Sequence, residues 1–282
     1  MKSKIALFIA IVVLICMTAA WSQNADPALL VTVEHEFAEA VAAHGVNAGF
    51  RQFLAPDGVI FRPGPVNGLE YLKDKPESKA RLTWEPEHVE MTAGGDYGWT
   101  TGPWELSADS TQPPSLFGQY LSIWQCQPDS SYKLVLDVGI VYPERRAPHD
   151  VGFVTLTGGM DHPYAAELLK GECDHLTDLD RVWMGSATAP DVLLLRTGLS
   201  PVVGADAFSD YKDAHPGSAT RSSAFAAVSA HGDFGYTYGT GTFLPEGSDP
   251  DESEPFAYVS LWKRNYKHAW WLAADITTPL PQ

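Results

Sequence analysis

The stretch Gly95-Asp-Tyr-Gly-Trp-Thr-Thr-Gly102 decides the fold, because it returns later in the chain as Gly232-Asp-Phe-Gly-Tyr-Thr-Tyr-Gly239. The residues after each copy also match, at an offset of 138 positions: Tyr120 with Tyr258, Trp124 with Trp262, and Asp137 with Asp275. Agreement at three separated positions with a single offset indicates duplicated domains rather than a solenoid of short repeats. The two halves of the chain are therefore expected to share one fold.

The N-terminus has the pattern of a secretory signal peptide. Lys2 and Lys4 precede an apolar run at 5–17, and Ala20 and Ser22 occupy the minus-three and minus-one places of a peptidase site. The run is shorter than the roughly 20 apolar residues that a spanning helix needs, and a retained anchor is the alternative interpretation. We predict a signal peptide at 1–22 and export to the periplasm or the cell exterior, with no membrane attachment after cleavage.

The rest of the chain is long enough for two domains of the commonest size, about 100 to 150 residues each. We predict a first domain at 23–142, a linker at 143–160 that could add a strand at 152–156, and a second domain at 161–282. Cys126 and Cys173 remain after cleavage, one in each half. They permit one disulfide in an oxidising compartment, and two separate buried thiols are the alternative.

Composition argues against several partners. The formal net charge is −16 over 282 residues, and loss of Lys2 and Lys4 with the signal peptide would make it −18. Nucleic acids and anionic lipids are bound through clustered Lys and Arg, so neither is an expected partner. Metal ligation needs side chains on one face, whereas Cys173-Asp174-His175 are consecutive on a predicted helix; we expect no metal and no other cofactor.

Hydrophobic periodicity changes along each half from a helical pattern to a strand pattern. The first half predicts helices at 27–44, 47–54 and 69–73, a strand at 59–61, and then strands at 88–91, 97–106, 116–126 and 132–141. The second half predicts helices at 164–179 and 205–211, a reduced helix at 182–186, and strands at 192–195, 222–230, 236–244, 256–264 and 270–276. Helices followed by an antiparallel meander predict an α+β fold.

These residues resemble the nuclear transport factor 2-like superfamily. The resemblance is carried by Phe53-Leu-Ala-Pro-Asp57 leading to Phe61-Arg-Pro-Gly64, by the repeated glycine stretch, and by Gly118-Gln-Tyr-Leu-Ser-Ile-Trp124. The superfamily includes SnoaL-like polyketide cyclases, ketosteroid isomerases and a large domain family of unknown function often found in exported bacterial proteins. The resemblance implies two tandem cone-like domains, each a strongly bent antiparallel sheet wrapped around helices. It also implies an intramolecular pseudo-dimer through the sheets, with two independent domains on a linker as the alternative.

The catalytic pattern of the ketosteroid isomerases is absent from both halves. That pattern places a base immediately before a proline at the end of the first strand, which here is Arg62, with Arg196 in the second half. Arginine stays protonated and cannot act as a base. The position of the helix tyrosine falls near Phe37, and that of the late-strand acid falls near Ser122 and Ser260. The resemblance therefore favours binding over catalysis.

Candidate ligand-binding residues recur in the two halves. Arg62 and Arg196 could hold a carboxylate or phosphate at a pocket mouth, or could simply pair with a neighbouring acid. Asp137 and Asp275 could be inward carboxylates or could make structural hydrogen bonds. The aromatic candidates either line a pocket or fill the core: Trp104, Tyr120, Trp124 and Tyr258.

Two functions are compatible with these candidates. We predict a protein that binds a small apolar or carboxylate-bearing molecule in a conical pocket without catalysis. The alternative is a SnoaL-like lyase or isomerase that abstracts a proton with a non-standard base, His88 or Asp137.

Overall fold

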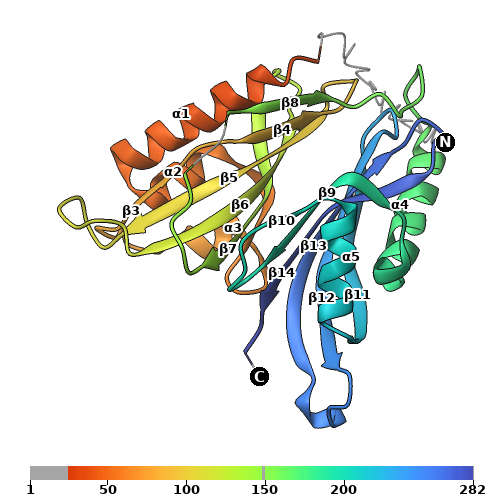
Figure 1. Ribbon diagram of the computed structural model, residues 1–282. Helices are drawn as coiled ribbons and strands as arrows, with labels where there is room; N and C mark the ends of the chain where they lie inside the picture. Colours follow the sequence, from red (N-terminus) through yellow and green to blue (C-terminus); the bar gives the residue numbers. More distant parts are fainter. Residues whose placement is uncertain (1–24, 148–149, 282) are drawn as a thin grey trace, which may run out of the picture.

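The computed structural model describes residues 25–147 and 150–281, so the predicted signal peptide lies outside the described residues. The chain forms two α+β domains, each with helices on one face of a strongly bent sheet (Figure 1). Between residues 25 and 281, the described helices include none that is long and apolar enough to cross a membrane. Cys126 and Cys173 are both free thiols.

The first domain contains three helices before its antiparallel meander. The helices are α1 (Ala28–His44), α2 (Val46–Phe53) and α3 (Gly68–Leu72). The strands are β1 (Leu54–Phe61), β2 (Pro65–Asn67), β3 (Arg81–Trp84), β4 (His88–Met91), β5 (Tyr97–Ser107), β6 (Leu116–Cys126) and β7 (Tyr132–Tyr142), followed by β8 (Gly152–Thr155). The predicted order of helices and long strands is confirmed, whereas the short β2 and β3 were not predicted.

The second domain repeats this order with a reduced helical layer. Its helices are α4 (Ala166–Arg181), the 3-10 turn η1 (Trp183–Gly185) and α5 (Ala205–Ala214), with a further 3-10 turn η2 (Pro250–Glu252). Its strands are β9 (Thr188–Arg196), β10 (Val202–Val203), β11 (Gly217–Val228), β12 (Phe234–Pro245), β13 (Glu254–Arg264) and β14 (Trp270–Pro279). The reduced second helix predicted from the sequence is the single turn η1.

The two sheets have equivalent topologies. The first has the order β2-β1-β7-β6-β5-β4-β8, with β3 also paired to β5, and the second has the order β10-β9-β14-β13-β12-β11. The first strand pairs in parallel with the last strand of the meander in both domains, while the meander itself is antiparallel. The segment 143–160, predicted as a linker, contributes β8, which pairs in parallel with β4 at the sheet edge.

The last glycine in each copy of the repeated stretch is explained by close backbone packing. A Cβ atom at Gly102 would collide with the carbonyl oxygen of Glu85, and a Cβ atom at Gly239 would collide with that of Ser222. Both positions therefore require glycine, because the strand passes too close to the neighbouring backbone for a side chain to fit. This steric requirement explains one of the glycines that the two copies share.

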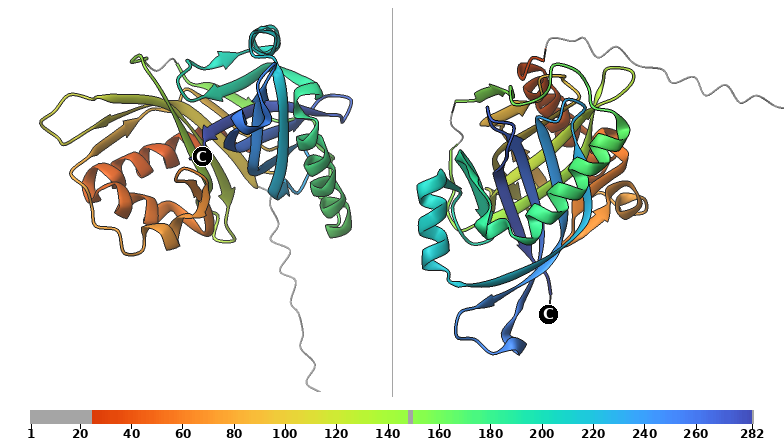
Figure 2. Two further views of the ribbon diagram at one scale, coloured as in Figure 1. Left: turned by 90° about the horizontal axis from the view of Figure 1, so that it is seen from below. Right: turned by 90° about the vertical axis from the view of Figure 1, so that its right-hand side faces the viewer.

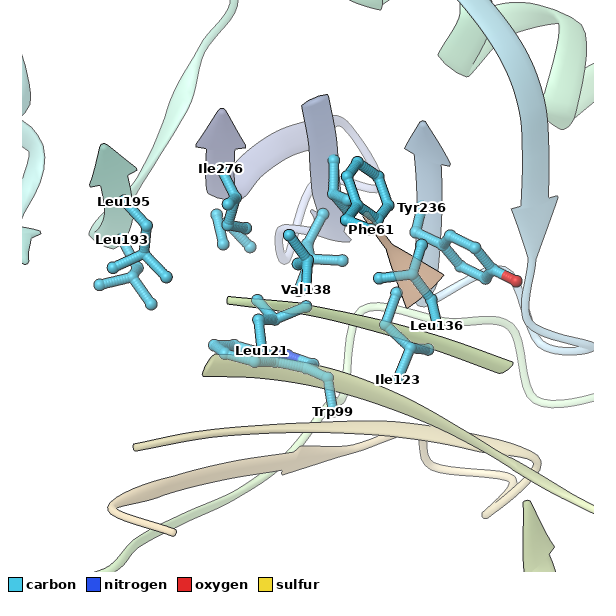
Figure 3. Packing of buried hydrophobic residues seen from close by; sticks show 14 of the residues in the cluster. Phe61, Trp99, Leu121, Ile123, Leu136, Val138, Leu193, Leu195, Tyr236 and Ile276 are labelled. Atoms are coloured by element: carbon cyan, nitrogen blue, oxygen red, sulfur yellow. The ribbon is translucent and has the colours of Figure 1, made fainter. Parts of the chain in front are cut away.

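The two sheets pack against each other, with the helices on the outer flanks (Figure 2). Leu121, Ile123 and Val138 from the first sheet meet Leu195 and Ile276 from the second in one buried apolar cluster (Figure 3). The alternation along β6 explains this division, because Leu121 and Ile123 face the partner sheet while Tyr120 and Trp124 face the helices. This sheet-to-sheet contact is the one that a pseudo-dimer requires.

Reciprocal hydrogen bonds show that the contact has pseudo-two-fold symmetry. The backbone N–H of Ala93 donates to Asp233 Oδ2 (2.7 Å), and the backbone N–H of Ala230 donates to Asp96 Oδ2 (2.6 Å). Ala93 and Ala230 are equivalent positions of the repeat, as are Asp96 and Asp233. The hairpin tip of each domain therefore donates to, and accepts from, the tip of the other. This self-complementarity is the property of an isologous dimer interface, here made within one chain.

Candidate functional site

The first domain contains a cavity of about 410 Å³ between its helices and the concave face of its sheet. Its wall is mainly aromatic, with Phe37 from α1, Phe50 from α2, Trp84 from β3, and Trp104 and Tyr120 from the meander. The two charged residues of the wall are Arg62 and Asp137. An apolar cavity with a few converging polar groups is the usual form of a small-molecule site.

Asp137 is a buried carboxyl group in the wall of this cavity. The Ser122 hydroxyl donates to its Oδ2 (3.1 Å), and the carboxyl makes no ion pair within the described part of the chain. Burial raises the pKa of Asp137 to about 6, although the nearby positive charge of Arg62 and the bond from Ser122 both oppose this rise. The carboxyl group is therefore ionised at neutral pH but changes protonation state just below it.

Arg62 lies at the end of β1 and is exposed at the cavity wall. Its Nη1 donates to the carbonyl oxygen of Phe61 (2.6 Å), and its guanidinium lies 6.0 Å from the centre of the Phe50 ring. No carboxylate of the described residues is within ion-pair distance of it. Its remaining N–H groups are free to bind an anion.

A second buried acid, Glu34, lies behind the aromatic wall. The indole N–H of Trp84 donates to its Oε2 (2.8 Å), the indole N–H of Trp124 donates to its Oε1 (3.0 Å), and the Thr100 hydroxyl also donates to Oε1. Burial raises the pKa of Glu34 to about 7, against the opposing effect of these three hydrogen bonds. Glu34 fixes the orientation of the tryptophans and does not itself line the cavity.

Tyr120 presents a hydroxyl without a partner. The group is buried and makes no hydrogen bond of normal geometry to any described residue. The nearby Thr100 hydroxyl, which opposes the rise in the pKa of Tyr120, already donates to Glu34. Burial, followed by the nearby Glu34, raises the pKa of Tyr120 well above its usual value, so the hydroxyl keeps its proton and can donate it to a ligand.

The second domain repeats Tyr120, Ser122 and Asp137 as Tyr258, Ser260 and Asp275, but Arg221 fills the site. The guanidinium of Arg221 is fully buried and bonds Asp275 (2.8 Å) and the Ser260 hydroxyl (2.8 Å). Arg196 also bonds Asp275. Although burial alone would raise it, the two guanidinium groups hold the pKa of Asp275 below its usual value. Tyr258 is likewise paired, because its hydroxyl donates to Asp180 (2.8 Å).

A separate cavity of about 420 Å³ remains above this closed floor, near the outer ends of the strands. Its wall includes Trp183, Arg196, Tyr211 and Phe256, but not Tyr258 or Asp275. The outer part of the second domain's conical pocket, its mouth, is therefore open. Its inner end beside Asp275, which we call the floor, is filled by Arg221.

The structure divides the predicted site residues into two groups. Arg62, Asp137, Trp104 and Tyr120 come together in the first cavity, and Arg196 lines the second. The other three predicted ligand contacts are corrected, because the structure buries them in the core with protein partners: Trp124, Tyr258 and Asp275.

His88 is also corrected as a candidate base of the pocket. It lies on β4, and its Nε2 is 3.2 Å from Glu90 Oε1 at the contact between the domains. The same Glu90 accepts hydrogen bonds from the indole of Trp99 and from Lys263 of the second domain. A residue held in this network faces away from the first cavity.

Sequence reasoning missed Glu34, Trp84 and Arg221. Glu34 had a detectable signal, since it lies four positions after Leu30 and three before Phe37, on the buried stripe of α1. An acid on that stripe has to be bonded or functional. Arg221 had no comparable signal, because its position depends on how β11 pairs with β12.

Comparison with known proteins concerns the fold alone. No family model and no curated protein matches the chain. Among solved structures, it is similar to a ketosteroid isomerase-like protein from Erwinia carotovora atroseptica (12% identity, 42% of this chain and 92% of that one, TM-score 0.31). A second is an NTF2-like protein of unknown function from Shewanella oneidensis (14% identity, 39% of this chain and 91% of that one, TM-score 0.28). A third is the S. rosetta CaMKII hub (14% identity, 42% of this chain and 100% of that one, TM-score 0.31). Each match covers between 39% and 42% of this chain.

Proposed function

We propose that the first domain binds a small molecule with an apolar body in its cavity, without catalysis, and that the second domain stabilises it as the other half of a pseudo-dimer. A difference between the domains supports this proposal. Asp137 and Arg62 lack ion-pair partners among the described residues, whereas Asp275 and Arg196 bond each other. Buried polar groups in proteins are normally hydrogen-bonded, and the buried Tyr120 hydroxyl of the same cavity has no partner among the described residues. The first cavity therefore suits a ligand that bonds these groups.

The aromatic wall and the charged groups define the chemistry of such a ligand. Trp84, Trp104 and Tyr120 provide flat apolar surface for its body. At the mouth, the exposed guanidinium of Arg62 suits a carboxylate on the outer end of the ligand. Export, predicted from residues 1–22, belongs to the same proposal and places the ligand outside the cytoplasm.

Native mass spectrometry of the chain from residue 23 onward, purified from a bacterial periplasm, tests this function. A bound small molecule should appear as added mass. Two half-buried alanines give matched variants, since Ala80 lines the first cavity and Ala219 lines the second. Ala80→Phe should remove the added mass and Ala219→Phe should retain it. A bare wild-type chain, or loss only in Ala219→Phe, would count against the first cavity.

Catalysis by Asp137 is the second candidate, favoured by the pKa of about 6 and by the position of this residue in the cavity wall. A carboxylate with such a pKa is a suitable base for removing a proton beside a carbonyl group. Tyr120 would donate its hydroxyl hydrogen to the oxygen of that carbonyl. Deuterium exchange of a cyclic ketone, followed by NMR, should be accelerated by the wild type and not by Asp137→Asn if this candidate is right.

A further inference from the structure

The duplication allows each residue of the first cavity to be compared with its counterpart in the second domain. Trp84 lies opposite Trp104 in the β3–β5 pair, and Arg221 lies opposite Gly241 in the β11–β12 pair. Trp104 and Gly241 are related by the offset of the repeated glycine stretch. Arg221 therefore occupies in the second domain the backbone position that Trp84 occupies in the first.

Arg221 shows which chemical group the floor of such a cone holds. Its guanidinium lies 4.0 Å from the centre of the Trp183 ring and 4.2 Å from that of Tyr258. Its nitrogens bond Asp275 and the Ser260 hydroxyl, and Asp180 lies within 3.8 Å. Aromatic faces together with carboxylates form the standard environment of a buried cation. The second cone thus contains its own cation, supplied by the chain.

The first cone keeps the acid and lacks the cation. Asp137 and Ser122 correspond to Asp275 and Ser260, and Tyr120 corresponds to Tyr258. Since Trp84 replaces the arginine, Asp137 faces the cavity with the Ser122 hydroxyl as its hydrogen-bond partner among the described residues.

From this comparison we infer that the ligand of the first domain carries an amine or guanidinium group, which reaches Asp137 and takes the place that the Arg221 guanidinium fills in the second domain. The inference rests on the proposed function of this cavity. Trp104 and Tyr120 would contact the apolar part beside the cation.

Charge supports a cation at the floor over an anion. A ligand carboxylate that reached the floor would meet the ionised Asp137, while one at the mouth would meet Arg62. Arg62 does not replace the missing cation, because it is exposed at the end of β1 and makes no ion pair with Asp137. The formal net charge of −16 also attracts cationic molecules to the protein.

Three probes of one size and different charge test the inference. Isothermal titration calorimetry at pH 7.5 would compare 1-naphthylmethylamine, 1-naphthalenemethanol and 1-naphthoate on the chain from residue 23 onward. The amine should bind about tenfold or more tightly than the neutral alcohol, as expected for a hydrogen-bonded charge pair. Asp137→Asn should remove that advantage and leave the affinity for the alcohol nearly unchanged.

The control variant is Glu254→Gln, which removes an acid from the wall of the second cavity and should keep the advantage of the amine. Circular dichroism melting would establish that both variants are folded. If the alcohol or the naphthoate binds as tightly as the amine or more tightly, the inference of a cationic ligand is wrong, while the proposed binding function still holds. Failure of all three probes at millimolar concentration would overturn both.

Discussion

Arg221 and Trp84 are the two residues that make the duplicated domains chemically different. In the second domain, the arginine neutralises Asp275 in a site that excludes water. In the first domain, the indole N–H of Trp84 donates to Glu34 instead, and Asp137 lines the cavity. The pocket floor is therefore open in the first domain, which has Trp84, and closed in the second domain, which has Arg221 at the equivalent strand position.

Removal of Arg221 should destabilise the protein strongly. Arg221→Leu leaves Asp275 with Arg196 alone and Asp180 without a guanidinium nearby. Loss of one partner from a buried ion pair costs about 3–5 kcal/mol of unfolding free energy. Urea denaturation would measure the loss, and the double variant Arg221→Leu, Asp275→Asn should recover part of it. A single variant as stable as the wild type would show that the arginine does not hold the floor together.

Asp137 should make the stability of the protein depend on pH. Its pKa is raised from 3.8 to about 6 in the folded state, so the folded protein binds more protons than the unfolded chain between these values. The stability that this difference contributes is present below about pH 4 and is lost as the pH rises through 6. Glu34, with a pKa raised from 4.5 to about 7, acts in the same direction.

Asp137→Asn should therefore stabilise the protein at pH 8 by on the order of 1–3 kcal/mol, and should have a smaller effect at pH 4. Urea denaturation at the two pH values measures both effects. The exposed Glu39→Gln on α1 is the control and should change stability little at either pH. A destabilised Asp137→Asn at pH 8 would mean that the ionised carboxylate is well satisfied by the folded protein.

At the level of elements, the paired hairpin tips β4–β5 and β11–β12 join the domains. Asp96 accepts hydrogen bonds from Thr92 of its own tip and from Ala230 of the other, and Asp233 does the same with Ser229 and Ala93. Both aspartates are buried. Replacing either one leaves a backbone N–H of the opposite domain without its acceptor.

Asp96→Ala and Asp233→Ala should each lower the unfolding free energy by about 1–3 kcal/mol, the usual consequence of an unsatisfied buried donor. Because the two contacts are reciprocal, the losses should be similar. Hydrogen exchange would locate the effect: Asp96→Ala should expose the amide of Ala230, and Asp233→Ala that of Ala93. Faster exchange confined to the tip that carries the substitution would contradict the reciprocal arrangement.

Most elements predicted from the sequence are long enough for a clear period, although the short α3 and β4 were also predicted. The strands β5, β6 and β7 alternate over 11 residues each, and α1 has a buried stripe over 17. The strands β2 and β10 have three and two residues, too few for alternation to be recognised.

Two of the candidate residues that line the first cavity were marked by the repeat. Asp137 and Tyr120 recur at a fixed offset, and both line the first cavity. Their counterparts Asp275 and Tyr258 carried the same signal and are closed off by Arg221. Residue type and spacing did not reveal this difference, because it depends on the pairing of β11 with β12, which places Arg221 opposite Gly241.

At the level of the whole molecule, the shared apolar cluster makes each domain depend on the other. Leu121, Ile123 and Leu136 of the first sheet are fully buried, as are Val259 and Leu261 of the second. Either sheet alone would expose this apolar surface to water, and large exposed apolar patches cause association or aggregation. The contact also includes the ion pair between Glu90 and Lys263 (2.9 Å).

The two halves should therefore fold only together. Fragments 23–157 and 158–282, produced separately, should be insoluble or oligomeric, while co-expression should give a soluble one-to-one complex that can be purified through a tag on either fragment. Leu121→Asp in the first fragment should abolish the complex, because it places a charge in the buried cluster. The control Glu39→Gln, on the outer helix, should leave it intact. Two fragments that are each soluble and monomeric would show that the domains are independent units, and that the open cavity does not require its closed counterpart for support.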